Sequence, residues 1–378
     1  MDKLRVLITM DWFDPAYKAG GPIMSIMKLV ENMQDHYDFF ILTSAKDYGD
    51  TEEMPHVQKD QWLDWRGLAK VYYLSEAQKS RSKIFEFMDS THADIYYIQG
   101  VFSLYFSIYP LIWWHQAKQD KVIVATRGMF HASALRVKRF KKLLFLYAAK
   151  IMGWYHHVIF HSTNPDETMH LKKILGNEAT YVEASNFPHF IPGDKIQRFK
   201  KEKTLRLLNV ARISPEKNTL FLLDVLKRVE ANVSLTLVGN YADEEYFRQC
   251  EKKIQSMPKN ITVTYAGHKP ISELQQFYET HDVFILPTTG ENFGHAIIEA
   301  LSSGMPSIIS RNTPWNGLET WNAGYNLNDD IVEYTNVIDK YYFMDSDAYN
   351  ITSEAAIAYS KQCIDVQSIK EEYLKLLS

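Results

Sequence analysis

Two glutamates, Glu291 and Glu299, stand on either side of a small-residue turn in the stretch PTTGENFGHAIIEALSSGMP. The apolar residues after the turn recur at helical spacing, and Gly304 followed by Pro306 predicts where that helix ends. Eight residues of helix place the two carboxylates at most ~12 Å apart along the axis. Because carboxylates accept paired hydrogen bonds from vicinal hydroxyls, this spacing suits a ligand with a polyol at each end and a phosphate between. A nucleoside diphosphate sugar has that layout.

The turn between the glutamates predicts an anion site. Gly294 lets the backbone approach a ligand, and the N–H groups of Phe293, Gly294 and His295 stand at the helix start, where the dipole favours negative charge. Taken alone, Glu299 could be a solvated helix residue, and Glu291 could favour the helix start through the dipole. However, apolar residues flank Glu299, and an unpaired carboxylate there would cost several kcal/mol or so. We therefore expect a ligand or a buried partner at Glu299.

A cationic cluster is predicted in the segment NVARISPEKNTLFLLDVL. A strand is expected to end at Ala211, followed by Arg212, a loop, and Lys217 near the start of a helix. A lysine there opposes the helix dipole unless it shares an anion, and a guanidinium and an ammonium are the two cations that proteins use for phosphate. The alternative is that both are surface residues with Glu216 as their partner.

A glycine pair follows the first expected strand in the segment DPAYKAGGPIMSIMKLVENM. Gly20 and Gly21 precede Pro22, which is favoured at the first helical position, and paired glycines can form an anion-binding turn there. A turn without a ligand is equally compatible with the pattern. Because G-x-G-x-x-G is absent, the sequence disfavours a dinucleotide-dependent dehydrogenase.

The elements that must position these residues alternate along the chain. Short apolar runs such as RVLITM, DFFILTS and DIYYIQG are each followed by helix-compatible sequence, which is typical of parallel sheets crossed by helices. The alternation stops at ASNFPHFIPGDK (184–195) and then resumes. We predict two doubly wound α/β domains, 1–190 and 191–378, with ligands at the carboxyl ends of the strands in the cleft between them. The last helix could pack on either domain.

Length and composition agree with this organisation. The chain has 378 residues, of which 46% are hydrophobic, enough for two cores. Lys and Arg total 42 against 46 Asp and Glu, so the average surface does not attract nucleic acid, and no nucleic-acid partner is expected. Cys250 and Cys363 show no metal-ligand spacing or disulfide framework, which suits a reducing compartment. With no export signal and no apolar run long enough to span a bilayer, a cytoplasmic location is predicted.

One segment departs from the acidic average. Residues 133–150 place basic side chains beside the apolar run LLFL; these are Arg136, Lys138, Arg139, Lys141 and Lys142. A basic amphipathic helix suits an anionic membrane surface on the inner face of the plasma membrane. The alternative, weighted equally, is a core helix with a solvated basic face.

The order and spacing of these motifs resemble family 4 of the retaining glycosyltransferases, whose members have the two-domain GT-B fold. The segments GENFGHAIIEALSSGMPSIIS and VARISPEKN and the glycine pair carry the resemblance, which covers most of the chain. It implies that Glu291 contacts the hydroxyls of the donor sugar, that Glu299 holds the ribose, and that Arg212 and Lys217 neutralise the leaving diphosphate.

The resemblance thus implies a catalytic set of Glu291, Arg212 and Lys217. The implied donor-binding set is Gly20, Gly21, Arg212, Lys217, Glu291, Asn292, Phe293, Gly294 and Glu299. The segments ATRGMF, FHSTNPDE and NTPWN further resemble a bacterial subgroup that builds surface polysaccharides such as lipopolysaccharide or capsule. That subgroup implies a saccharide or lipid-linked saccharide as acceptor.

Two positions depart from the pattern of the family. Many relatives carry a histidine where this chain has Arg127, with His131 a few residues later, so the usual role of that histidine is left unassigned. An aspartate often precedes the segment corresponding to NTPWN in the family, whereas Arg311 stands there in this chain.

The expected chemistry needs no cofactor. Cleavage of a glycosyl phosphate develops negative charge on the leaving diphosphate, which cations and backbone amides can stabilise without a metal. The Asp-x-Asp pattern Asp345-Ser346-Asp347 lies in a polar segment and is interpreted as a helix cap. The resemblance implies retention at the anomeric carbon, and no carboxylate shows the pattern of a nucleophile, so front-face displacement is the working hypothesis. The alternatives are a nucleotide-sugar 2-epimerase of GT-B architecture and a non-catalytic binding scaffold.

Overall fold

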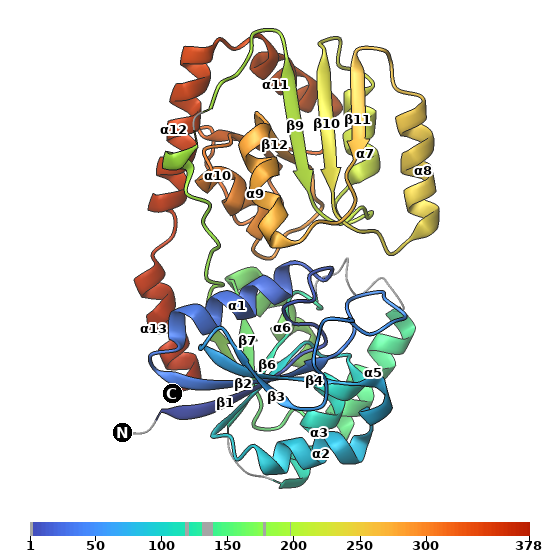
Figure 1. Ribbon diagram of the computed structural model, residues 1–378, viewed down its shortest axis with the longest axis vertical. Coiled ribbons are helices and arrows are strands. Elements are labelled where there is room, and N and C mark those ends of the chain that lie inside the picture. Colours follow the sequence, from blue (N-terminus) through green and yellow to red (C-terminus); the bar gives the residue numbers. More distant parts are fainter. Residues whose placement is uncertain (1–2, 118–120, 131–138, 177–178, 197) are drawn as a thin grey trace. The chain divides into compact units, whose positions relative to one another are not determined.

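The structure is a computed structural model that describes residues 3–117, 121–130, 139–176, 179–196 and 198–378 (Figure 1). The chain divides into two compact units: Met1–Phe187 with Val366–Ser378, and Pro188–Asp365. The division falls inside the segment 184–195 where the sequence pattern stops, three residues before the predicted boundary. The last helix belongs to the first unit.

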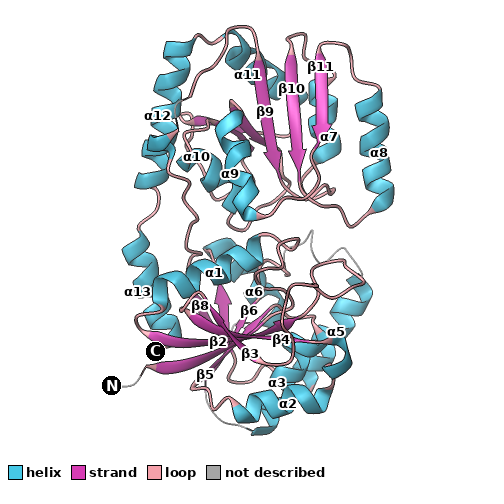
Figure 2. Cartoon of the chain, in the orientation of Figure 1, coloured by secondary structure: helices cyan, strands magenta, loops and turns pink. Residues whose placement is uncertain are grey.

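The first unit contains an eight-stranded sheet with helices on both faces (Figures 1 and 2). Its strands are β1 (Leu4–Thr9), β2 (Tyr37–Ser44), β3 (Trp62–Trp65), β4 (Ala69–Leu74), β5 (Ile95–Gln99), β6 (Lys121–Ala125), β7 (Ile159–Ser162) and β8 (Thr180–Glu183). Its helices are α1 (Gly21–Met33), α2 (Arg81–Ser90), α3 (Tyr109–Ala117), α5 (Arg139–Ile151), α6 (Pro165–Leu175) and α13 (Val366–Leu377), with short helical turns at Glu76–Gln78 and Leu104–Ile108.

The strand order of this sheet is β3-β4-β2-β1-β5-β6-β7-β8. Neighbouring strands are parallel except β3 and β4, which pair antiparallel at one edge. The direction of chain progression reverses between β1 and β5. In doubly wound sheets this reversal is where ligands bind, at the carboxyl ends of the strands.

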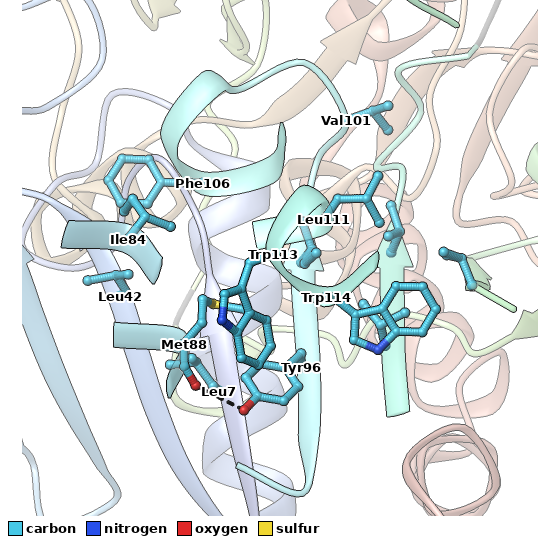
Figure 3. Packing of buried hydrophobic residues seen from close by; sticks show 14 of the residues in the cluster. Leu7, Leu42, Ile84, Met88, Tyr96, Val101, Phe106, Leu111, Trp113 and Trp114 are labelled. Carbon is cyan, nitrogen blue, oxygen red and sulfur yellow. Dashed lines mark hydrogen bonds between the residues drawn. The ribbon is translucent and has the colours of Figure 1, made fainter. Parts of the chain in front are cut away.

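One apolar core cluster of the first unit lies between one face of this sheet and helices α2, α3, α5 and α6. Figure 3 shows Trp113 of α3 beside Met88, Tyr96 and Leu7, and Trp114 of the same helix farther from these three residues. The Tyr96 hydroxyl donates a hydrogen bond to the Met88 carbonyl at 3.0 Å, which satisfies its polar end inside the apolar cluster. The burial of these large side chains fixes the helices on this face.

Helix α13 packs on the first unit although it follows the second in sequence. The ring of Tyr373 is fully buried and stacks on Phe187, with centroids 5.2 Å apart. Glu372 accepts a hydrogen bond from the backbone N–H of Ser185 at 2.8 Å. These contacts join α13 to Ser185 and Phe187, which lie at the end of the first unit's main segment.

The second unit contains a six-stranded parallel sheet with the order β11-β10-β9-β12-β13-β14. Its strands are β9 (Leu205–Val210), β10 (Val233–Val238), β11 (Ile261–Tyr265), β12 (Val283–Leu286), β13 (Ser307–Ser310) and β14 (Gly324–Leu327). Its helices are α7 (Thr219–Leu226), α8 (Glu244–Gln255), α9 (Ile271–Thr280), α10 (His295–Ser302), α11 (Ile331–Phe343) and α12 (Ser346–Gln362), with a short turn at Gly193–Lys195.

Apolar side chains cover both faces of this second sheet. One cluster joins the sheet to α7, α8 and α11, and the other joins it to α9, α10 and α12. The prediction of two doubly wound α/β units is therefore confirmed, and the second sheet has the order of a Rossmann fold, with its reversal between β9 and β12. The sequence pattern missed β3, β8 and β14.

Candidate functional site

The strand reversal of the second sheet brings two predicted segments together. Strands β9 and β12 are parallel neighbours, so their carboxyl ends share one edge, and the loops that follow them carry the predicted cations and the first glutamate. The loops are bonded to each other, because Thr289 N–H donates to the Glu216 carbonyl at 2.8 Å. A third loop takes part, since Glu291 N–H donates to the Asn312 carbonyl at 3.0 Å.

Lys217 and Glu291 form an ion pair at this edge. The Lys217 Nζ lies 2.6 Å from Glu291 Oε1, and only 11% and 16% of the two side chains are exposed. Glu216 is adjacent to Lys217 in the sequence, but its Oε1 lies 3.9 Å from the Lys217 Nζ, beyond hydrogen-bonding distance. The structure thus brings together a cation and a carboxylate that are 74 positions apart, and the ammonium has two further N–H donors besides the one directed at Glu291.

Arg212 lies after the same strand in a more exposed position. Its side chain is 46% exposed and its guanidinium approaches Glu216 at 3.5 Å. The surface pairing with Glu216 that the sequence left open is therefore present for Arg212. Such exposed pairs stabilise a fold by ~1 kcal/mol or less, so Arg212 is only weakly held in this position.

The turn before α10 adopts the conformation that its glycine allows. Gly294 has φ 78° and ψ 60°, and a Cβ there would lie 2.9 Å from Ile297 Cδ1 and 3.0 Å from Glu291 Cγ. The Phe293 carbonyl accepts a hydrogen bond from Trp315 Nε1. Because the Phe293 side chain is buried in the core, only its backbone remains for a ligand. Asn292 lies in the same turn, and in the first turn of α10 the Ile297 N–H donates to the Gly294 carbonyl at 2.9 Å.

Glu299 is a buried carboxylate with two partners. It is 5% exposed on α10, and its Oε1 lies 3.0 Å from His189 Nδ1 while its Oε2 accepts from the Tyr278 hydroxyl at 2.8 Å. The partner expected from the apolar flanks of Glu299 therefore exists. Burial and the nearby Glu299 carboxylate raise the pKa of Tyr278 well above its usual value, so the phenol remains a donor. Each carboxylate oxygen accepts more than one hydrogen bond, so Glu299 can still accept from a ligand.

The glycine pair lies in the other unit. Gly20 has φ 67° and caps α1, which begins at Gly21 with Pro22 in its first turn. No atom lies within 4 Å of a Cβ built on Gly20, so the turn is open on that side. It follows β1, whose carboxyl end lies at the strand reversal of the first sheet. The predicted residues Arg212, Lys217, Glu291 and Glu299 belong to the second unit, and Gly20 and Gly21 belong to the first.

The two positions that depart from the family pattern have defined contacts. Arg127, with φ 50°, donates from Nε to Gln99 Oε1 at 2.8 Å and from Nη1 to Asn186 Oδ1 at 2.7 Å. Arg311 donates from Nε to the Asn326 carbonyl at 3.1 Å. Both guanidiniums are thus engaged within their own units, and His131 lies outside the described residues.

The Asp-x-Asp segment is a helix cap, as predicted. The Asp345 side chain accepts from Ala348 N–H at 2.8 Å and begins α12. In the described part of the chain no group of three or more His, Cys, Asp or Glu residues could hold a metal. Both cysteines are free, and no helix in the described ranges is long and apolar enough to cross a membrane.

Known proteins match both the site and the fold. Residues 192–317, which contain Arg212, Lys217, Glu291 and Glu299, match the family described as "Glycosyl transferases group 1". Sucrose-phosphate synthase from Thermosynechococcus elongatus superposes with a TM-score of 0.71 at 15% identity, covering 100% of this chain and 98% of that one. The chain has the GT-B fold, and its residues 192–317 are similar to the group 1 glycosyl transferases.

Two further structures share the GT-B fold. Anabaena Alr3699/HepE in complex with UDP and glucose superposes with a TM-score of 0.71 at 14% identity, covering 99% of each chain. WaaG, a glycosyltransferase involved in lipopolysaccharide biosynthesis, gives a TM-score of 0.65 at 13% identity, also covering 99% of each chain.

Sequence relatives of this chain include a synthase named for a glycolipid and a transferase named for a sugar group. Alpha-monoglucosyldiacylglycerol synthase of Streptococcus pneumoniae (strain ATCC BAA-255 / R6) is 25% identical over 347 residues, covering 83% of this chain and 73% of the relative. Sulfoquinovosyl transferase SQD2 of Arabidopsis thaliana is 32% identical over 117 residues, 31% of this chain. The matched region spans only 21% of SQD2, about a fifth of its length.

Sequence reasoning missed the residues that hold the two glutamates in place. His189 lies in the segment that was interpreted only as a domain seam, and Tyr278 lies on α9 with no motif around it. Asn312 and Trp315 belong to NTPWN, which the sequence singled out without a role. That segment fixes Glu291 through its backbone and Phe293 through the indole.

Proposed function

We propose that this GT-B chain transfers a sugar from a nucleoside diphosphate sugar to an acceptor, with retention of anomeric configuration and without a metal. The Lys217–Glu291 pair at the strand reversal carries this proposal. It places a cation and a hydroxyl-binding carboxylate within hydrogen-bonding distance, where an open α/β sheet binds ligands. Glu299, on the helix that begins at the same turn, supplies a carboxylate for the ribose.

The residues have distinct parts in the proposed reaction. The bond between the anomeric carbon and the diphosphate oxygen breaks, a bond from the acceptor oxygen forms on the same face, and the acceptor proton passes to the leaving diphosphate. Lys217, Arg212 and the first-turn amides of α10 stabilise the negative charge that develops on the diphosphate. Glu291 binds hydroxyls of the sugar and orients the lysine. Gly20 and Gly21 offer a further anion-binding turn from the first unit.

For the acceptor, we propose a saccharide or lipid-linked saccharide of a bacterial surface polysaccharide such as lipopolysaccharide or capsule, at the inner face of the plasma membrane. The resemblance of ATRGMF, FHSTNPDE and NTPWN supports the class of pathway, and the relative named for monoglucosyldiacylglycerol supports a lipid-borne acceptor. Two free cysteines suit a cytoplasmic location. A nucleotide-sugar 2-epimerase remains the alternative enzyme, and a binding scaffold the alternative without catalysis.

The test compares Glu291→Gln with Glu216→Gln. Both carboxylates lie near Lys217, but only Glu291 is within hydrogen-bonding distance. We expect the Glu291 variant to lose transfer by about 10²–10³-fold in kcat/KM while retaining diphosphate binding, and the Glu216 variant to stay within about threefold of wild type. The measurement is a screen of nucleotide sugars against lipid-linked saccharides, followed by release of the nucleoside diphosphate.

Other outcomes would contradict the proposal. An epimer formed from donor alone would favour the epimerase, and nucleotide binding with no turnover on any acceptor would favour the scaffold. A product with inverted anomeric configuration would contradict the proposed retaining mechanism. Full activity after exhaustive chelation is expected, whereas activity restored only by a divalent cation would overturn metal independence.

A further inference from the structure

Helix α5 presents a continuous apolar stripe to solvent. The residues of the stripe are Phe140, Leu144, Tyr147 and Ile151, with exposed fractions of 80%, 59%, 66% and 68%. Their spacing of four, three and four residues places them on one side of the helix. Met152, directly after the helix, is 47% exposed and extends the apolar surface. Monomeric proteins expose single apolar side chains routinely, but a contiguous row of this kind marks an interaction surface.

The opposite side of the same helix is firmly packed. Leu146 is 5% exposed and Ala149 fully buried, and both belong to the core of the first unit together with strands β5, β6 and β7. Phe145 packs against this core with its ring centroid 5.9 Å from that of Phe102. Figure 1 shows α5 at the periphery of the first unit. The stripe is therefore the outer face of a helix whose inner face is already packed against the core of the first unit.

Lysines border the stripe. At about 100° per residue, Lys141 and Lys150 fall on its two sides, and both are exposed. The sequence of α5, RFKKLLFLYAAKI, contains no acidic residue. The same holds from 121 to 165, which has no Asp or Glu on a chain of net charge −4. A helix face that is apolar in the middle and cationic at the borders, on a helix with no carboxylate of its own, complements an anionic apolar partner.

The geometry points to an anionic lipid bilayer as the occupant of this stripe. The aromatic and aliphatic side chains enter the interface between headgroups and acyl chains, and Lys141 and Lys150 extend to the lipid phosphates. The inference deepens the proposed function, on which it rests for the lipid-borne acceptor, because it brings the first unit to the surface where such an acceptor lies. Docking itself requires neither donor nor acceptor, so it can be measured separately.

A second copy of the chain is a poorer occupant. A twofold contact of stripe on stripe would place the lysines of both copies in one interface with no carboxylate from either α5 to pair with them. The charge repulsion would oppose the gain from apolar burial. A lipid surface supplies the missing negative charge at about 1 kcal/mol of attraction per nearby basic residue.

The experiment is sedimentation of the whole protein with vesicles of phosphatidylcholine, with and without phosphatidylglycerol. We expect binding to the anionic vesicles, weakened as salt is raised, and at least tenfold weaker binding to the neutral ones. The double variant Phe140→Ser/Tyr147→Ser should bind the anionic vesicles at least tenfold more weakly, and so should Lys141→Glu/Lys150→Glu, whose apolar stripe is intact. The matched control is Phe343→Ser on α11, 71% exposed in the second unit, which should bind as wild type does.

Each other result would overturn the inference. Equal binding to neutral and anionic vesicles, an unchanged affinity of either double variant, or an equal loss in Phe343→Ser would each exclude α5 as the docking surface. A wild-type dimer in solution that becomes monomeric in the Phe140/Tyr147 variant would assign the stripe to a second copy instead. UDP-dependent thermal stabilisation should be the same in all variants, so a defect in docking is distinguishable from failure of the proposed transferase site.

Discussion

Glu299 depends on two donors that come from distant parts of the second unit. Tyr278 reaches it from α9, and His189 reaches it from the segment that enters the unit. A buried carboxylate with one donor on each oxygen is held in a single orientation. If Glu299 binds the ribose as proposed, both side chains act as positioning residues that determine where its remaining lone pairs point.

Tyr278→Phe tests this arrangement. Removing the hydroxyl leaves Glu299 Oε2 without its internal donor, which we expect to lower the free energy of unfolding by about 1–3 kcal/mol and the affinity for nucleoside diphosphate by about tenfold. Denaturant unfolding and calorimetric titration with UDP measure the two effects. Tyr349→Phe is the control, because its buried hydroxyl donates to the Asp282 carbonyl at 2.7 Å, outside the proposed site.

The two variants should be destabilised to a similar extent, and only Tyr278→Phe should bind nucleotide more weakly. Equal nucleotide affinity in both would show that the orientation of Glu299 has no part in binding. His189→Ala should weaken binding in the same direction as Tyr278→Phe, since it removes the contact with the other carboxylate oxygen.

At the scale of single residues, the sequence predicted that Glu299 requires a partner but did not predict which residues are its partners. The apolar neighbours of Glu299 indicated that it requires a partner, because a lone buried carboxylate is costly. His189 and Tyr278 lie 110 and 21 positions away, and no local pattern connects them to Glu299. Lys217 and Glu291 were each identified, yet their direct pairing depends on the adjacency of β9 and β12, which the order of strands along the chain does not state.

Among the elements, the turn that starts α10 requires a left-handed backbone conformation that favours glycine. Gly294 and Gly317 share φ 78°, so alanine is strained at both. They differ in surroundings, because a Cβ at 294 would crowd Ile297 and Glu291, whereas none of the atoms around Gly317 lies within 4 Å of a Cβ there. A comparison of the two separates backbone strain from the shape of the site.

We expect Gly294→Ala to be destabilised by ~1 kcal/mol or more beyond Gly317→Ala, and to lose transferase activity by at least tenfold when Gly317→Ala does not. Thermal unfolding and steady-state kinetics provide the two measurements. Should both variants keep equal activity, close approach of the backbone at 294 would have no role in donor binding.

The strands that the sequence predicted and those that it missed differ in burial. Strands β1 and β5 are nearly continuous apolar runs that are buried in the middle of their sheet, and such runs are recognisable without a structure. The missed strands β3, β8 and β14 each have four residues and lie at sheet edges, and β3 and β8 are largely exposed. These three segments form strands because a neighbouring strand pairs with them, and their own amino-acid composition gives only a weak strand signal.

At the scale of a whole unit, a buried histidine makes stability depend on pH. His161 lies in β7, accepts from the Tyr97 hydroxyl at 2.7 Å and donates to the Ala184 carbonyl at 2.8 Å. Burial, and then the charge of Arg127, lower the pKa of His161 to about 4. An unfolded histidine has a pKa near 6.5, so its stabilising effect is fully present above that pH and is lost as the pH falls toward 4.

Between pH 7.5 and pH 5 we therefore expect wild type to lose about 2 kcal/mol more unfolding free energy than His161→Asn loses. Urea unfolding at the two pH values gives the comparison, with His156→Asn, at an exposed position, as the control that should follow wild type. Parallel pH profiles for wild type and His161→Asn would show that the imidazole does not stay neutral in the folded state.

The position of α13 has a consequence for synthesis. Translation completes β1 through β8 before any residue of the second unit, but the surface that receives Tyr373 stays uncovered until the ribosome has passed residue 365. The second unit is contiguous and has all its strands and helices by then. In a nascent chain the second unit can thus complete its fold before the first unit does. The first unit is completed only at the end of elongation, when α13 packs on Phe187.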